Sequence, residues 1–211
     1  MKITRRKFSI GASASVLTVA GLAAPAMAQG PAPAELMAPG PLPEMSLGDA
    51  KAPVTIVEYA SMTCPHCAAF HETTYPALKK KYIDTGKVRF IFREFPLDQL
   101  AAAAFMLARC AGADRYFPMI EVLFHQQRDW AVQRPLAPLM AIGKQAGLSE
   151  QAFNECLKDQ KLLDSIEETR QRGATKFGVQ STPTFFINGK ILRGNNTMAD
   201  FEKEIEPYLK S

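Results

Sequence analysis

Clusters and alternation of hydrophobic residues predict four β-strands, two early in the chain and two near its end. Residues 54–60 form a short apolar run rich in β-branched side chains, which is typical of a buried strand. Residues 88–95 alternate between apolar and polar side chains, as a second strand does. Residues 183–187 and 190–193 flank an Asn-Gly pair, a dipeptide that favours a two-residue turn. The last two strands are therefore expected to form a hairpin.

Helical periodicity accounts for most of the remaining sequence. One helical pattern begins after residue 64 and continues toward Tyr82, and Pro76 is expected to kink or divide it. Thr197 can N-cap a final helix that ends near Leu209. In the middle of the chain no convincing strand interrupts a series of helical patterns, at residues 101–111, 114–127, 135–146, 149–157 and 160–176. This order of elements predicts an α/β fold with a helical insertion.

Residues 1–28 have the features of an export signal. A basic start is followed by a mildly apolar run, and Ala26 and Ala28 match the small-residue pattern that signal peptidase accepts. The start resembles a twin-arginine signal because it contains Arg5 and Arg6. An uncleaved membrane anchor is the alternative, although serines and glycines weaken the apolar run. We expect cleavage directly after Ala28.

The segment after this signal is predicted to be a flexible leader. Residues 29–48 contain five prolines and three glycines, and they show neither a helical nor an alternating period. Such a composition favours an extended, poorly packed chain. We therefore expect the fold to begin only after this segment.

Composition and charge narrow the class of protein. A chain of 211 residues with 47% hydrophobic residues can bury a core, which excludes disorder throughout. The net charge of +4 belongs to the signal, because residues 1–28 hold four of the 25 basic residues and none of the 21 acidic residues. A nucleic-acid-binding protein would keep a basic surface after processing. We therefore expect no nucleic-acid partner.

The motif Cys64-Pro65-His66-Cys67 is the strongest candidate for chemistry. Two cysteines at this spacing can cycle between dithiol and disulfide, provide half of a zinc site or attach haem. Haem attachment needs a histidine directly after the second cysteine, where this chain has alanine. A closed zinc site usually needs a second close pair of ligands, whereas the other two cysteines stand alone. Redox chemistry remains, with an inert disulfide as the alternative.

The start of the predicted helix gives this redox interpretation a physical basis. A sulfur at a helix N-terminus faces unpaired N–H groups and the positive end of the helix dipole, and both stabilise a thiolate. The imidazole of His66 can add to this effect, and Pro65 suits the first helical turn. We expect Cys64 to be the exposed, attacking sulfur with a lowered pKa, and Cys67 to be the buried resolving thiol.

Three features of the sequence together resemble the DsbA-like thiol:disulfide oxidases of the thioredoxin superfamily. They are the Cys-Pro-His-Cys motif, Glu58 on the preceding strand, and Thr182-Pro183 before the hairpin. The match extends from about Val54 to the C-terminus. It implies a thioredoxin fold with an inserted helical domain. The expected parts are a thioredoxin-like domain at residues 49–97 and 178–211 and a helical insertion at residues 98–177.

The resemblance also implies roles for individual residues. Glu58 matches a buried acid beneath the active site, thought to assist proton movement at the resolving cysteine. Thr182-Pro183 matches a loop with a cis peptide bond before proline, which in this family abuts the cysteine pair and can bind an extended substrate segment. Position 182 departs from the valine of the best-known member. A merely structural carboxylate at Glu58 and an ordinary turn at Pro183 are the alternatives.

Three other residues are candidates for a supporting role. Cys110 and Cys156 lie 46 residues apart in different predicted helices, and export favours a structural disulfide between them. Closing such a loop contributes about 4 kcal/mol on the chain-entropy model. Two buried free thiols are the alternative. His71 follows Cys67 at the i, i+4 spacing, and we interpret it as a partly exposed helix residue rather than a contact of that cysteine.

These observations predict a periplasmic, monomeric dithiol oxidase without a cofactor or a bound metal. Its partners would be unfolded or newly exported proteins that contain cysteines. The resemblance implies a membrane quinone-linked protein as the reoxidising partner. An isomerase or reductase of the same superfamily is one alternative. A module of another class, which binds copper or acts as a chaperone, would use soft ligands from the set Met62, Cys64, His66 and Cys67.

Overall fold

A five-stranded mixed sheet forms the centre of the structure, a computed structural model that describes residues 31–210. The strand order is β1-β3-β2-β4-β5, with β2 parallel to β3 and the other neighbours antiparallel. The strands are β1 (Met45–Leu47), β2 (Val54–Ala60), β3 (Val88–Glu94), β4 (Thr184–Ile187) and β5 (Lys190–Arg193).

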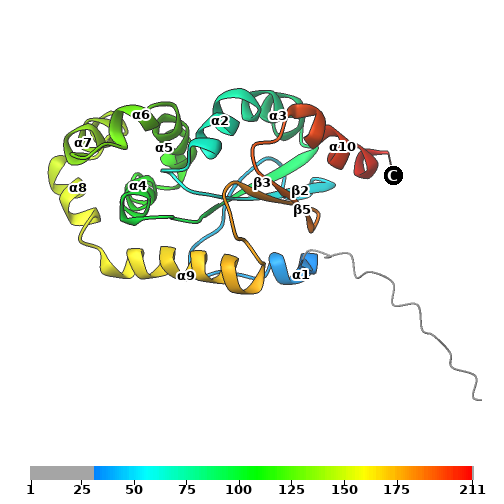
Figure 1. Cartoon of the computed structure of the whole chain (residues 1–211), viewed down its shortest axis with the longest axis horizontal. Coiled ribbons are helices and arrows are strands. Elements are labelled where there is room, and N and C mark those ends of the chain that lie inside the picture. Colours follow the sequence, from blue (N-terminus) through cyan, green and yellow to red (C-terminus); the bar gives the residue numbers. More distant parts are fainter. Residues whose placement is uncertain (1–30, 211) are drawn as a thin grey trace, which may run out of the picture.

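Helices cover both faces of this sheet, and a helical block extends from one side of it (Figure 1). One face carries α2 (Pro65–Thr73), α3 (Tyr75–Leu78), the π-helical turn Lys79–Ile83 and α10 (Met198–Leu209). The other face carries α1 (Pro33–Leu36) and α9 (Gln160–Lys176). The block consists of α4 (Gln99–Cys110), α5 (Ala113–His125), α6 (Gln127–Trp130), α7 (Leu136–Gln145) and α8 (Glu150–Cys156).

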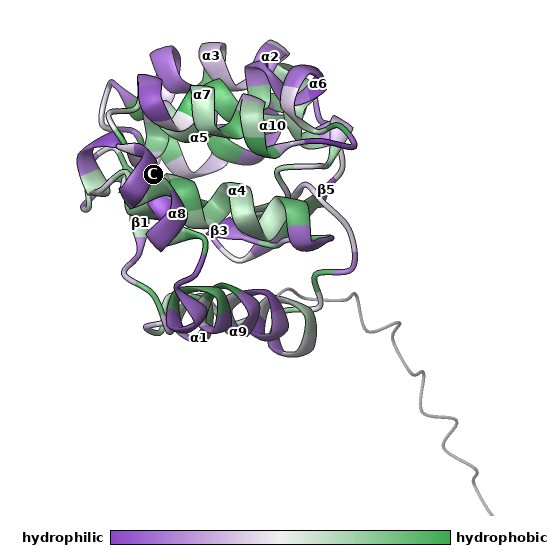
Figure 2. Ribbon diagram, turned by 90° about the vertical axis from the view of Figure 1, so that its left-hand side faces the viewer, coloured by the Kyte–Doolittle hydropathy of each residue, from purple (hydrophilic) through white to green (hydrophobic). Residues whose placement is uncertain are grey.

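The central strand β2 explains why two layers of helices are needed. Its residues alternate between the two faces, and all but Thr55 are buried. Ile56 and Ala60 join the large core toward α2 and the helical block, whereas Val57 and Tyr59 join the smaller core beneath α9. The apolar sides of these helices face the sheet in Figure 2. A strand that is apolar on both sides is stable only when both sides are covered.

The element order confirms the expected α/β class with helices inserted between β3 and β4. The hairpin turn and the last helix also form as expected, since Asn188 and Gly189 have positive φ angles and Thr197 makes a capping box with Asp200. Pro76 divides the helical pattern, as expected, into α2 and α3. The last helix of the predicted insertion, α9, packs against the sheet. Gly173 of this helix lies so close to Tyr59 of β2 that an added Cβ atom would be 2.8 Å from Cε1 of the tyrosine ring.

The prediction of a flexible leader is wrong for residues 31–48. This segment, here called the strap, forms α1 and then the edge strand β1, so the sheet begins before the expected boundary at residue 49. Leu36 of the strap is 2% exposed and packs in the core beneath α9. Proline and glycine gave no periodic pattern, yet the segment is ordered by contacts with residues far along the chain.

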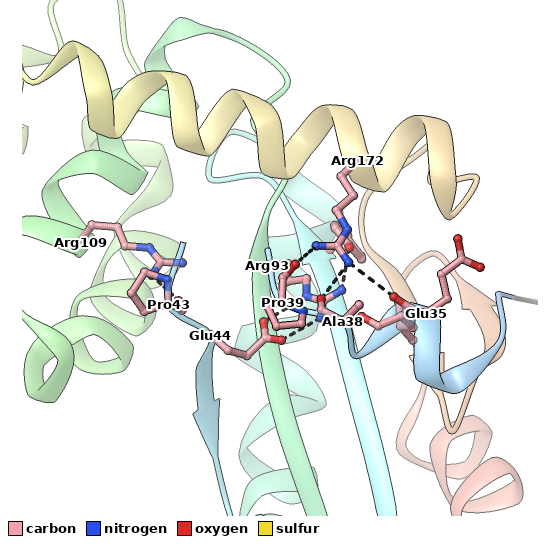
Figure 3. A network of polar contacts seen from close by, with 10 residues as sticks. Glu35, Ala38, Pro39, Pro43, Glu44, Arg93, Arg109 and Arg172 are labelled. Atoms are coloured by element: carbon pink, nitrogen blue, oxygen red, sulfur yellow. Dashed lines mark hydrogen bonds and ion pairs between the residues drawn. The ribbon is translucent and has the colours of Figure 1, made fainter. Parts of the chain in front are cut away.

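Three arginines from other elements hold the strap (Figure 3). Arg172 of α9 donates to the carbonyl oxygens of Ala38, Pro39 and Glu35, the first of these at 2.8 Å. The other two arginines make three contacts at 2.8 Å. Arg93 of β3 donates to Glu44 and to the Leu36 carbonyl, and Arg109 of α4 donates to the Pro43 carbonyl. A proline-rich segment has few N–H groups but keeps its carbonyls, so donors from side chains can order it.

The predicted export signal, residues 1–28, lies outside the described residues. Among the helices of residues 31–210, none is long and apolar enough to cross a membrane.

Replacing Arg172 with alanine should release the strap. The variant loses charged donors to three carbonyls, and we expect amide exchange in residues 33–42 to rise about tenfold, which corresponds to a loss of about 1.5 kcal/mol. Lys176→Ala, an exposed position on the same helix, is the matched control. Equal exchange in both variants, measured by mass spectrometry, would show that Arg172 does not hold the strap.

Candidate active site

The cysteine pair lies where β2 ends and α2 begins. Cys64 is the N-cap residue of α2, with an extended backbone at φ −81° and ψ 118°, and Pro65 is the first helical residue. Cys67 follows in the first turn of the helix. Both cysteines are free thiols in the structure. The helix start thus presents its unpaired N–H groups to the Cys64 side chain, as expected for a redox pair.

Burial differs from the expected arrangement at one of the two sulfurs. Cys67 is fully buried, as predicted, but Cys64 is only 5% exposed rather than an exposed sulfur. The covering comes from the distant loop at Thr182, whose carbonyl oxygen lies 3.3 Å from the Cys64 sulfur. Pro65 and His66 are the exposed members of the motif. Access from solvent to the Cys64 side chain is therefore small, whereas Pro65 and His66 lie at the surface.

Hydrogen bonds lower the pKa of Cys64 from 9.0 to about 5. The largest cause is a hydrogen bond from the Cys67 thiol, and burial opposes it. Hydrogen bonds from the Thr182 side chain and from the backbone N–H groups of Cys67 and His66 add to the lowering. Each donor stabilises the thiolate and not the thiol. Cys64 is consequently a thiolate at neutral pH.

The same hydrogen bond has the opposite effect on Cys67. Burial is the main reason that the pKa of Cys67 lies well above its ordinary value, and the proximity of Cys64 and the charge of Glu58 raise it further. The two thiols are chemically inequivalent for this reason. At neutral pH one is an anion able to attack or leave, and the other keeps its proton.

The loop before β4 completes this arrangement. The Thr182–Pro183 peptide bond is cis, and both residues are buried. In the thiol form, Cys64 donates to the Thr182 carbonyl, while the Thr182 hydroxyl has no hydrogen-bond partner. Once Cys64 has lost its proton it can no longer donate, and the free hydroxyl of Thr182 is then available to donate to the sulfur. The backbone of this loop thus lies against the reacting atom.

Glu58 lies beneath the site and has a partner that sequence reasoning missed. Its carboxylate is fully buried, and its Oε2 atom lies 3.0 Å from Nε2 of His71. The interpretation of His71 as a partly exposed helix residue is wrong, since it is 3% exposed. Its ring stacks on Phe124 of the helical block at 4.2 Å. The i, i+4 spacing from Cys67 placed His71 on the inner side of α2, but the acid opposite it comes from another element.

This buried pair leaves some hydrogen-bonding capacity unused. Oε1 of Glu58 and Nδ1 of His71 have no hydrogen-bond partner. The charge of Glu58 acts on Cys67 and helps to raise the pKa of that thiol. The buried pair therefore makes Cys67 harder to deprotonate.

Cys110 and Cys156 lie away from this site and form a disulfide in the helical block. The bond joins α4 to the end of α8 across a sequence separation of 46 residues. Their arrangement suits a stabilising role for the block.

The comparisons with known proteins define the class to which this fold and site belong. A sequence profile of the thioredoxin family matches residues 42–207, and the match begins within the strap. The structure superposes on that of alpha-DsbA1 from Wolbachia pipientis with a TM-score of 0.77 and 36% identity, covering 83% of this chain and 96% of that one. BdbD from Bacillus subtilis gives a TM-score of 0.72 at 25% identity, covering 80% and 94%.

A curated relative points the same way. A putative protein-disulfide oxidoreductase of Rickettsia typhi is 38% identical over 169 residues, which are 79% of this chain and 62% of that protein. The chain thus spans about three fifths of the length of this relative. The chain belongs to the thioredoxin family, and within it to the DsbA-like group of thiol:disulfide oxidoreductases.

Alkylation of the reduced protein should reveal the Cys64 thiolate. We expect the rate with iodoacetamide to rise with pH around a midpoint near 5, because only the thiolate reacts. The lowered pKa also stabilises the reduced fold at high pH, and this contribution is lost as the pH falls through about 5. Cys64→Ser should remove the fast reaction. A midpoint between 8 and 9 would contradict this assignment.

Breaking the Glu58–His71 pair should cost more than removing it. We expect Glu58→Leu and His71→Leu each to lower the free energy of unfolding by about 3 kcal/mol, because each leaves a buried polar group without its partner. The double variant should recover most of this loss. Urea unfolding of all four proteins measures the coupling, and additive losses would mean that the two side chains do not interact.

Proposed function

We propose that this protein is an extracytoplasmic dithiol oxidase that introduces disulfide bonds into exported proteins. The observation that carries the proposal is the stabilised Cys64 thiolate, with its pKa near 5. A thiolate held by several donors favours the reduced pair over the Cys64–Cys67 disulfide. The disulfide therefore gives up its oxidising equivalents readily to other thiols.

The reaction proceeds through a mixed disulfide. A substrate thiolate attacks the Cys64 sulfur, the Cys64–Cys67 bond breaks, and Cys67 leaves with the electron pair and takes up a proton. A second substrate thiolate then attacks the substrate sulfur of the mixed disulfide, and Cys64 leaves as a thiolate. The substrate has lost two electrons and gained a disulfide, and the enzyme holds both cysteines reduced. Reoxidation needs an acceptor, which we propose to be a membrane quinone-linked protein.

The arrangement of the site supports this route. Cys64 is the attacked sulfur because it is the more accessible one, and its low pKa makes it a good leaving group. Glu58 supports the departure of Cys67 by handling its proton. The backbone at Thr182 and Pro183 faces the sulfur and suits an extended substrate segment.

The proposed location of the reaction is the periplasm. The predicted signal at residues 1–28 supports export to the periplasm, with the twin-arginine route suggested by Arg5 and Arg6. Substrates are unfolded or newly exported proteins with free cysteines. We propose that the protein acts as a monomer, with the sheet domain carrying the cysteine pair and the helical block covering it.

Equilibration with glutathione buffers tests the oxidase proposal. We expect the Cys64–Cys67 couple to have a reduction potential near −120 mV, the value known for DsbA. Alkylation and mass mapping of the two thiols give the reduced fraction at each buffer ratio. The peptides of Cys110 and Cys156 serve as an internal control, because they should stay joined throughout. A potential near −270 mV, as known for thioredoxin, would support a reductase instead.

A further inference from the structure

Gln127, a residue of the helical block, contacts the loop that carries the attacking cysteine. It is the first residue of α6 and is 8% exposed. Its side-chain Nε2 atom donates to the carbonyl oxygen of Met62 at 2.8 Å and to that of Cys64 at 3.0 Å. The two hydrogens of one amide group therefore bridge two carbonyls that lie more than 60 residues away in the sequence.

The two carbonyls belong to the part of the loop that sets the Cys64 conformation. The Cys64 carbonyl also accepts the first bond of α2, from the N–H of Ala68 at 3.2 Å. Holding this oxygen fixes ψ of Cys64, which is 118°. That angle decides how the sulfur sits relative to the N–H groups of His66 and Cys67. A rotation there would turn these donors away from the sulfur.

A second contact with the helical block holds Thr63, the residue before Cys64. Thr63 donates to Asp98, the N-cap of α4, at 2.7 Å. Gln127 itself sits on a rigid base, because the indole of Trp130 in the same helix is fully buried and donates to the Leu123 carbonyl at 2.7 Å. Two parts of the helical block, at the starts of α4 and α6, thereby hold the loop that carries Cys64.

We propose that Gln127 is a positioning residue that holds the Cys64 loop in the conformation in which the helix N–H groups face the sulfur. Its two N–H groups also compensate the partial negative charge of the carbonyls next to Cys64. The helical block thus contributes to the redox poise of a pair that lies outside it. This inference rests on Cys64 being the attacking cysteine, but it does not depend on the direction in which the enzyme works.

Gln127→Met tests the proposal, because methionine keeps the length of the side chain and removes both donors. We expect the Cys64 pKa of the reduced variant, followed by thiolate absorbance, to rise by about one unit. The equilibrium with glutathione should shift about tenfold toward the Cys64–Cys67 disulfide, which is about 30 mV more reducing. Gln126→Met, at the preceding half-buried position, is the matched control.

A measurement of thermal stability and a second variant, Gln127→Glu, separate a loss of positioning from a loss of folding. Thermal unfolding of both variants shows whether Gln127→Met is folded under the conditions of the titration. If it is not, Gln127→Glu, which has the same shape and no amide donor, should raise the Cys64 pKa at least as far. A folded variant with the wild-type pKa and the wild-type equilibrium would overturn the proposal. The absolute potential of the wild-type protein tests the oxidase function separately, since only the difference between variants concerns Gln127.

Discussion

The stabilisation of one thiolate at a helix start is the constraint on which the rest of the site depends. Cys64 needs donors within hydrogen-bond distance, yet burial alone would raise its pKa. The donors come from Cys67 and the α2 backbone on one side and from the Thr182 loop on the other. These groups are brought together only because β2 and β4 are neighbours in the sheet. The order of strands is therefore part of the chemistry.

The fold pairs its buried polar and charged side chains on both sides of the same sheet. Glu58 and His71 lie on the side of the active site, whereas Arg93 meets Glu44 of the strap on the other side. A polar or charged group without a partner in the interior is costly. In the pair at Glu58, the Oε1 atom has no hydrogen-bond partner, and the charge of Glu58 helps to raise the pKa of Cys67.

The helical block and the strap have complementary effects on the sheet. The strap adds an edge strand and fills the core beneath α9, which fixes the sheet from the side remote from the cysteines. The block covers the side of the sheet that carries the cysteines. It places Phe124 against His71 and Gln127 against the loop that carries Cys64. The block is thus more than a cover, because it holds the backbone whose N–H groups face the sulfur.

The sequence by itself determined the strands β2 to β5, the starts of α2 and α10, the cysteine pair and the inequality of its two thiols. These follow from local pattern, since side-chain period, capping residues and the position of Cys64 before Pro65 act over a few residues. Only the tertiary structure decided the burial of Cys64, the partner of Glu58, the order of the strap and the contact of Gln127. Each of these depends on a donor or a covering group from a distant element. The strap is an example, because its proline-rich sequence has neither a helical nor an alternating period. Three arginines elsewhere in the chain donate the hydrogen bonds that order it.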